Sequence, residues 1–227
     1  MIELWPAIPL FIAAIMASLT RGSLRAIIML AAPLISAYAI FQLEPGTVFF
    51  VELMGLQLTP VRIVALSILF GYLFNLAALI GVIYALHVKD PMQDLAALAY
   101  AGSAVGAVLA GDLLTLFVYW ELLALTSVFL IFARRTERAY KAGMRYLLIQ
   151  ISSGLLLLSG AIFYSSAGNG LSFNYIGLES SGGWLIFIAF GIKAAFPLLH
   201  GWLTDAYPEA TPTGTVFLAS FTTKVAI

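Results

Sequence analysis

The sequence predicts an all-α protein, a polytopic bundle of membrane-spanning helices. Three observations favour this class: 62% of the 227 residues are hydrophobic, only 10% are charged, and the mean hydropathy is +1.03. Soluble domains carry roughly 25% charged residues and about 45–50% apolar residues, so this composition leaves no room for a soluble domain. The chain has no cysteine and only two histidines, far apart in sequence. Thiolate sites, disulfides and a histidine-rich metal cluster are therefore excluded.

Eight apolar runs approach the roughly 17–25 residues of a transmembrane helix. The first has neither the basic start nor the cleavage pattern of a signal peptide, so we expect a membrane helix there. The eighth holds 16 residues and stops at the last residue without a polar cap. We therefore expect a truncated chain, or a remainder that lies elsewhere. The eight expected spans are Leu4–Thr20, Leu24–Leu43, Arg62–Leu86, Pro91–Ala110, Asp112–Ala133, Arg145–Ser166, Gly183–Trp202 and Pro212–Ile227.

Small residues recur along the fourth run at a spacing of about four, which lets helix backbones approach closely. The stretches 44–60 and 167–182 are rich in Gly, Pro, Ser and Asn, and we expect ordinary surface loops there. Asp112 begins the fifth run, where an aspartate is typical of a helix N-cap. Asp205 and Glu209 lie in the turn before the eighth run, and we interpret both as structural.

The basic residues predict the orientation of the chain. Eight of the eleven fall after the first, third and fifth runs, Arg62 alone lies on the opposite side, and Lys193 and Lys224 lie within runs. Because cytoplasmic loops are enriched in Lys and Arg, we expect these eight in the cytoplasm and the N-terminus on the other side of the plasma membrane. The eight are Arg21, Arg25, Lys89, Arg134, Arg135, Arg138, Lys141 and Arg145.

The seventh run carries Lys193 near its centre and Pro197 four residues later. A lysine at that depth costs at least ~2.5–3.5 kcal/mol, and by default it marks a functional pathway. Pro197 lacks the N–H that would bond the carbonyl of Lys193, and its ring clashes with that carbonyl. We therefore predict a helix broken at the buried charge. The alternative is a plain kink with Lys193 reaching the membrane interface.

Glu121 lies near the middle of the fifth run and is the natural partner of Lys193, because a buried charge is least costly when paired. Lys224 in the eighth run is expected to be a second buried lysine, which would leave one positive charge in excess. Sites whose protonation depends on a neighbour suit a proton relay. A static ion pair that only fixes helix packing is the alternative.

Two further polar residues leave their roles open. His200 follows Lys193 by seven residues and is a candidate relay for proton uptake, because its ordinary pKa of about 6.5 suits that task. It could equally be a histidine bonded near a helix end. Gln150 in the sixth run is either a hydrogen-bonding link between helices or a ligand of a water chain.

The segments LLTLFVYWELLALTSVFLI and KAAFPLLHGWLTDAYPEATPTGTVFLASFTTK resemble the antiporter-like subunits shared by respiratory complex I and the Mrp-type multisubunit cation/proton antiporters. The resemblance runs from about residue 112 to the end. It implies that Glu121, Lys193 and Lys224 form a proton relay on helices five, seven and eight, with Pro197 at the helix break. Thr204 and Thr211 depart from the pattern, since prolines are common there.

The resemblance also implies a fold of about fourteen helices, in which helices four to eight and nine to thirteen form inverted repeats. Residues 1–90 would then hold the first three helices, and residues 91–227 the first repeat with its last helix cut short. Such a segment supplies one half-channel of a transport path. The amino-acid sequence of the second segment resembles the D-type subunit of Mrp antiporters more than a subunit of complex I.

We therefore expect a proton-translocating subunit of a multisubunit monovalent cation/proton antiporter, exchanging protons for Na⁺ or K⁺. The alternatives are a proton-pumping subunit of a complex I-type NADH:quinone oxidoreductase or membrane hydrogenase, and an inert membrane scaffold. No cofactor is expected, because the sequence has no cysteine cluster, paired haem histidines or Gly-rich dinucleotide loop. Any electron transfer would therefore take place in partner subunits and not in this chain. Those partners are expected to be other integral membrane subunits within the lipid bilayer, and not nucleic acid.

Overall fold

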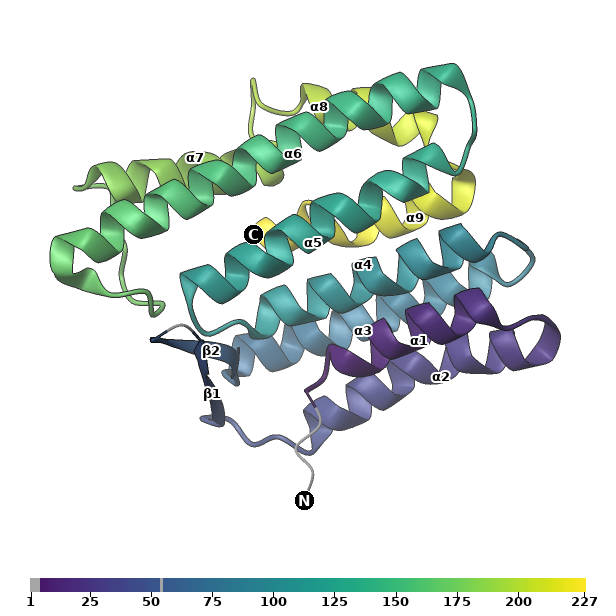
Figure 1. The fold of residues 1–227 in the computed structure, drawn as a ribbon, viewed down its shortest axis with the longest axis horizontal. Helices are drawn as coiled ribbons and strands as arrows, with labels where there is room; N and C mark the ends of the chain where they lie inside the picture. Colours follow the sequence, from purple (N-terminus) through teal and green to yellow (C-terminus); the bar gives the residue numbers. More distant parts are fainter. Residues whose placement is uncertain (1–4, 54) are drawn as a thin grey trace.

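The computed structural model describes residues 5–53 and 55–227, and shows helices packed side by side as a bundle (Figure 1). Leu4, the expected start of the first span, lies outside the described residues. Helices α6 and α7 form one edge of the bundle, and α1 and α2 form the opposite edge. The elements are α1 (Ile8–Leu19), α2 (Gly22–Phe41), β1 (Val48–Leu53), β2 (Leu56–Arg62), α3 (Ala65–Ala85), α4 (Pro91–Leu109), α5 (Leu113–Phe132), α6 (Glu137–Tyr164), η1 (Ser165–Asn169), α7 (Ser181–Lys193), α8 (Gly201–Ala206), η2 (Tyr207–Glu209), α9 (Pro212–Phe221) and η3 (Lys224–Ala226).

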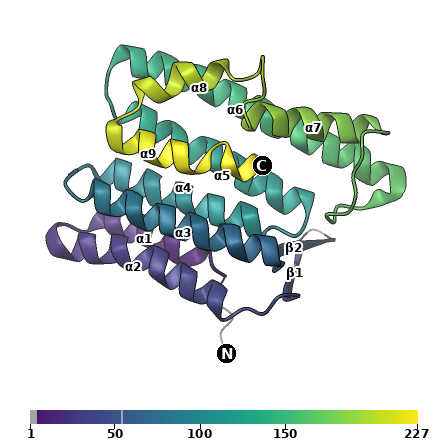
Figure 2. The ribbon, with the colours of Figure 1, turned by 180° about the vertical axis from the view of Figure 1, so that it is seen from behind.

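Helix α4 lies at the centre of the bundle and packs against α1, α3, α5 and α9 (Figure 2). Its small side chains allow this. A Cβ added at Gly106 would lie 2.2 Å from Tyr119 of α5, and one added at Gly102 would lie 3.2 Å from Leu10 of α1. The small residues of the fourth run therefore serve close helix packing, as their spacing predicts.

Five of the described helices, α2 to α6, are long and apolar enough to cross a membrane. Large apolar side chains such as Ile27, Leu69 and Ile162 lie exposed on the outer helices, as expected of surfaces that face lipid. The bundle is therefore polytopic, but it differs from the eight full spans expected. Helix α1 has 12 residues, α7 stops after 13 at Lys193, and α9 has only 10.

The stretch 44–60 was expected to be an ordinary surface loop, and the structure adds two short strands there to a bundle that is otherwise helical. Strands β1 and β2 form an antiparallel hairpin there. The run from Val48 to Val51 is β-branched and aromatic, which suits a strand, and Gly55 takes a φ of +78° near the turn. Arg62 is the last residue of strand β2. Helix α3 therefore begins at Ala65 and not at Arg62 as expected.

Helix α6 begins at Glu137, eight residues before the expected start of the sixth span at Arg145. Thr136 caps this end by accepting a hydrogen bond from the Ala139 backbone N–H at 3.1 Å. The first turns of α6 are charged, and the apolar run alone could not reveal them as helix. They bring the amino-terminal end of α6 beside α8 and η2.

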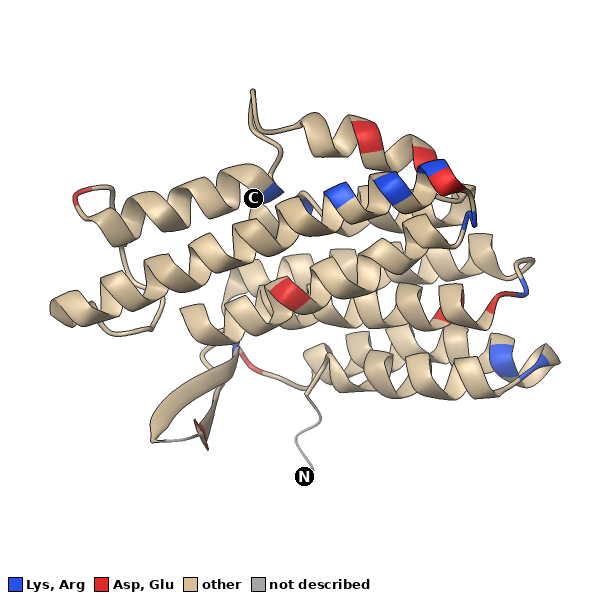
Figure 3. Cartoon of the chain, turned by 45° about the horizontal axis from the view of Figure 1, so that its top comes forward, with Lys and Arg blue, Asp and Glu red and all other residues tan. Residues whose placement is uncertain are grey.

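The charged residues gather at one end of the bundle (Figure 3). Basic side chains of α2, of α6 and of the connection between α5 and α6 are paired there with carboxylates. The pairs are Arg25–Asp94 at 2.7 Å, Arg135–Asp90 at 2.9 Å, Arg138–Glu209 at 2.7 Å and Arg145–Asp205 at 2.7 Å. This end of the bundle therefore contains several of the basic residues from which the cytoplasmic side was predicted.

Candidate functional site

Helix α7 ends at Lys193, and the chain resumes a helix only at Gly201. Pro197 lies in the exposed break between them. Ala195 and Leu198 have φ values of +58° and +74°, a backbone region that costs a non-glycine residue about 1–3 kcal/mol. Backbone strained in this way persists only where the surrounding structure holds it in place.

At the end of α7, backbone carbonyl groups that would accept hydrogen bonds from the next helical turn accept them from other donors instead. The Phe196 backbone N–H donates to the Gly191 carbonyl at 2.9 Å. The indole N–H of Trp202, from α8, donates to the Ile192 carbonyl at 2.9 Å. The negative end of the α7 dipole therefore lies beside Lys193, where it favours a cation.

The Lys193 side chain is only 1% exposed. Its ammonium group donates a hydrogen bond to the backbone carbonyl of Trp120 on α5, with an Nζ to O distance of 3.0 Å. The same Nζ lies 4.3 Å from the centre of the Trp120 ring. An isolated buried ammonium would be very costly, so these contacts, with a nearby carboxylate, are what the position requires.

Glu121 is that carboxylate. It directly follows Trp120, the residue of α5 that accepts the hydrogen bond from Lys193. The two residues do not form an ion pair within 4.0 Å. Oε1 of Glu121 is buried without a hydrogen-bond partner, and it faces Gly154 of α6, where an added Cβ would lie 1.6 Å from it. The structure thus brings Glu121 and Lys193 into one site with their charges apart.

Ser153 fixes the orientation of the Trp120 ring. The indole N–H donates to the Ser153 hydroxyl at 3.1 Å, and that hydroxyl donates to the Ala189 carbonyl of α7 at 2.8 Å. The Phe190 ring packs on Trp120 with centroids 4.8 Å apart. Sequence reasoning missed both Trp120 and Ser153. The only signal was an indole directly before the glutamate, which says nothing about Ser153.

Gln150 lies one turn before Gly154 on α6. Its side chain is fully buried, and neither its amide nitrogen nor its amide oxygen has a protein partner. It therefore does not form the hydrogen-bonded link between helices that was one of its two expected roles. An unpaired buried polar atom costs about 1–3 kcal/mol, so this position suits contact with water.

Two predicted relay residues lie apart from this site. Lys224 is exposed and donates to the Thr223 hydroxyl at 3.2 Å, so the expectation of a second buried lysine is wrong. It lines a pocket of about 190 Å³ beside the start of α3. His200 is also exposed, at the start of α8, and makes no capping hydrogen bond with its side chain.

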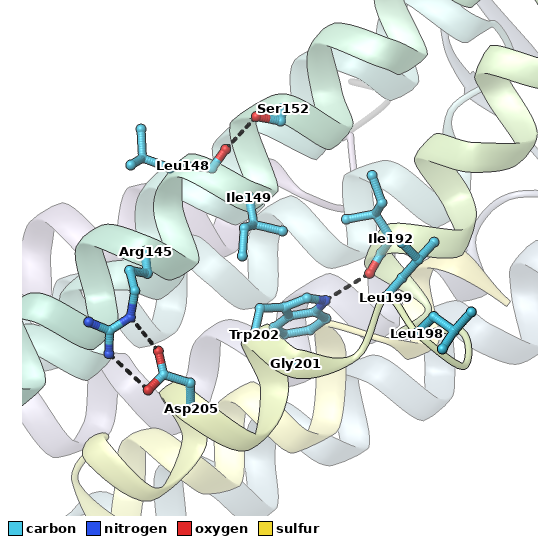
Figure 4. A pocket seen from close by; sticks show the side chains of 10 residues that line it. All are labelled: Arg145, Leu148, Ile149, Ser152, Ile192, Leu198, Leu199, Gly201, Trp202 and Asp205. Atoms are coloured by element: carbon cyan, nitrogen blue, oxygen red, sulfur yellow. Dashed lines mark hydrogen bonds and ion pairs between the residues drawn. The ribbon is translucent and has the colours of Figure 1, made fainter.

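An open pocket of about 830 Å³ lies beside the helix break (Figure 4). Arg145 donates two hydrogen bonds across one side of it to Asp205, at 2.7 and 2.9 Å. These hydrogen bonds lower the pKa of the Asp205 carboxyl group, which agrees with its structural interpretation. Lys193 does not line the pocket. Its lining residues are Arg145, Leu148, Ile149, Ser152, Ile192, Leu198, Leu199, Gly201, Trp202 and Asp205.

A sequence profile described as "NADH:quinone oxidoreductase/Mrp antiporter, TM" matches residues 110–227. NAD(P)H-quinone oxidoreductase chain 4 1 of Synechococcus elongatus is 27% identical over 169 residues, which cover 70% of this chain and 31% of the relative. The D-type subunit of a probable K(+)/H(+) antiporter of Rhizobium meliloti is 32% identical over 119 residues, which cover 47% of this chain and 22% of the relative. The chain therefore matches a third or less of the length of these relatives.

A subunit of the membrane-bound sulfane sulfur reductase, an archaeal respiratory membrane complex, has a similar fold. The superposition has a TM-score of 0.85 at 26% identity, and covers 99% of this chain and 39% of the other. The helix bundle therefore resembles part of one chain of a respiratory membrane complex.

Proposed function

Because the chain belongs to the NADH:quinone oxidoreductase/Mrp antiporter transmembrane family, we propose that it conducts protons within a multisubunit monovalent cation/proton antiporter. Lys193 carries the proposal. It is a lysine 1% exposed, in the last turn of a helix, and it contacts the residue directly before Glu121. An ionisable residue buried in an apolar membrane bundle is by default a candidate for an ion pathway.

In the proposed mechanism Glu121 and Lys193 exchange a proton with the pathway in turn. While Glu121 is ionised it attracts the Lys193 ammonium, and when Glu121 takes up a proton that attraction is lost. The lysine is then free to lose its own proton, because burial disfavours an uncompensated charge. Lys224 and His200 belong to the proposal through their place in the sequence pattern alone, as later and earlier steps.

The wider setting is part of the same proposal. We place the chain in the plasma membrane, with the charged end of Figure 3 in the cytoplasm, among other integral membrane subunits. Residues 1–90 would form an N-terminal helical unit and residues 91–227 one antiporter-like repeat. The exchanged cation would be Na⁺ or K⁺, which share a charge and differ in size.

A proton-pumping subunit of a quinone-reducing or hydrogenase complex is the second candidate. The observation that favours it is the match of 70% of this chain to a quinone oxidoreductase chain. Proton movement driven by Na⁺ or K⁺ in membranes without an electron donor supports the antiporter, whereas movement that requires an electron donor supports the pump.

The test uses Glu121→Gln and Lys193→Ala in everted membrane vesicles that contain the assembled complex. We expect both variants to lose cation-driven dequenching of a pH-sensitive acridine dye while the amount of assembled complex stays normal. Glu137→Gln and Lys141→Ala are matched controls, because this exposed pair lies at the surface of α6. Normal dequenching in Glu121→Gln and Lys193→Ala would support the inert scaffold instead.

A further inference from the structure

We propose that Trp120 is a positioning residue for the proton pathway: it provides a second resting place for the Lys193 ammonium group, in competition with Glu121. This inference rests on the proposed function above. Its basis is that Lys193 contacts one residue in two ways, through the Trp120 carbonyl at 3.0 Å and the Trp120 ring at 4.3 Å.

The ring of Trp120 presents a face to Lys193 because its edge is held elsewhere. The indole N–H is bonded to Ser153, and Ser153 is bonded to the α7 backbone at Ala189. One chain of hydrogen bonds therefore ties α5, α6 and α7 together around the ammonium group. The face of an indole is the best aromatic surface for a cation, and the contact strengthens where water is excluded.

Glu121 complements this arrangement. Its buried Oε1 has no partner, although a buried carboxylate oxygen ordinarily finds one. The ammonium group that could fill this role is held on the neighbouring residue instead. Lys193 therefore has two alternative acceptors on adjacent residues of α5, and in the proposal its flexible stem moves between them.

The other elements packed near Lys193 add little charge. Glu121 is the charged group that acts on it. On α6, Ser153 and Gln150 are buried and carry no charge at any pH of a transport assay. On η3, Lys224 is exposed and bonded to Thr223. The balance between the two resting places is therefore set by Glu121 and Trp120.

The consequence is a defined shift in the pH dependence of transport. Without the indole ring, Lys193 would rest on Glu121 for longer, and a higher proton concentration would be needed to protonate that carboxylate. In Trp120→Leu we expect the midpoint of the pH profile to move to lower pH, by about three- to tenfold in proton concentration. Trp120→Phe keeps an aromatic face and Ser153→Ala keeps the indole, so both should shift it less in the same direction.

The measurement is cation-driven proton transport by the assembled complex from about pH 5.5 to 9, normalised to the amount of complex. Trp184→Leu is the matched control, because Trp184 lies half-exposed on α7 and should leave the midpoint unchanged. If Trp120→Leu fails to assemble, Trp120→Phe and Ser153→Ala carry the test. A loss of rate with an unshifted midpoint in all assembled variants would overturn the inference and leave Trp120 as packing.

The two proposals fail in different ways. If Glu121→Gln and Lys193→Ala transport normally, the proposed function itself is wrong. If both abolish transport and the Trp120 and Ser153 variants keep the original midpoint, only the role of Trp120 is wrong.

Discussion

The carboxyl group of Glu121 fits against α6 because residue 154 is glycine. A Cβ at this position would lie 1.6 Å from Oε1 and 2.7 Å from the carboxyl carbon of Glu121. Both atoms belong to the end of a flexible side chain, so the helices themselves need not separate. A methyl group here would therefore move the carboxylate and leave the bundle in place.

This argument predicts the effect of Gly154→Ala. Displacing a side chain from its preferred rotamer costs about 0.5–1.5 kcal/mol, so we expect transport to fall by about two- to tenfold with normal assembly. Gly201→Ala is the control, since a Cβ at Gly201 meets no atom within 4 Å. Equal transport by the two variants would contradict the placement of Glu121.

At the scale of single elements, α5 is anchored at its amino-terminal end by Asp112. This buried carboxylate accepts hydrogen bonds from the Thr115 N–H at 2.7 Å and the Thr115 hydroxyl at 2.7 Å. It also accepts one from the Thr59 N–H of β2 at 2.6 Å. One residue therefore caps α5 and attaches the hairpin to it.

Asp112→Ala should accordingly destabilise the bundle by about 2–4 kcal/mol, because it removes a cap and leaves a buried N–H of Thr59 without a partner. Thr136→Ala is the comparison, because it removes only the cap of α6 and should cost about 1 kcal/mol. Denaturant unfolding in detergent micelles measures both. A cost for Asp112→Ala no larger than that of Thr136→Ala would show that the hairpin attachment contributes nothing.

The end of α9 explains the position of Lys224. Tyr100 of α4 shares a hydrogen bond with the Thr222 hydroxyl, which donates to the Leu218 carbonyl at 2.8 Å. Tyr207 donates to the same carbonyl at 2.9 Å. These hydroxyl groups hold the last turn of α9 in the core, and Lys224, two residues beyond Thr222, points out of it.

At the scale of the whole molecule, the charges divide the bundle into unlike ends (Figure 3). Arg135, Arg138 and Arg145 reach across to the carboxylates of Asp90, Glu209 and Asp205, so this end is both basic and tied together. The hairpin and the connection between α6 and α7 lie away from it. Because basic loops stay in the cytoplasm, the distribution predicts the topology.

The absence of cysteine from the sequence makes this topology directly testable. We expect Lys141→Cys to react with a membrane-impermeant maleimide only after cells are opened. Asn174→Cys, which is exposed in the connection between α6 and α7, should react in intact cells. The reverse pattern would invert the proposed orientation.

The sequence by itself determined the membrane class, because hydrocarbon admits only apolar helices of sufficient length, and that requirement is visible in composition. It also singled out Glu121 and Lys193, since an ionisable residue in an apolar run is conspicuous without any knowledge of its neighbours. Pro197 marked the break for a similarly local reason, the loss of one backbone N–H.

Only the tertiary structure decided which of these residues meet. Trp120 contacts Lys193, and Ser153 holds Trp120, because three successive helices pack together, and no local pattern encodes that packing. Lys224 looked buried in its apolar run, yet α9 ends at Phe221 and Lys224 lies exposed beyond it. Burial is a property of packed neighbours, so a single apolar run cannot specify it.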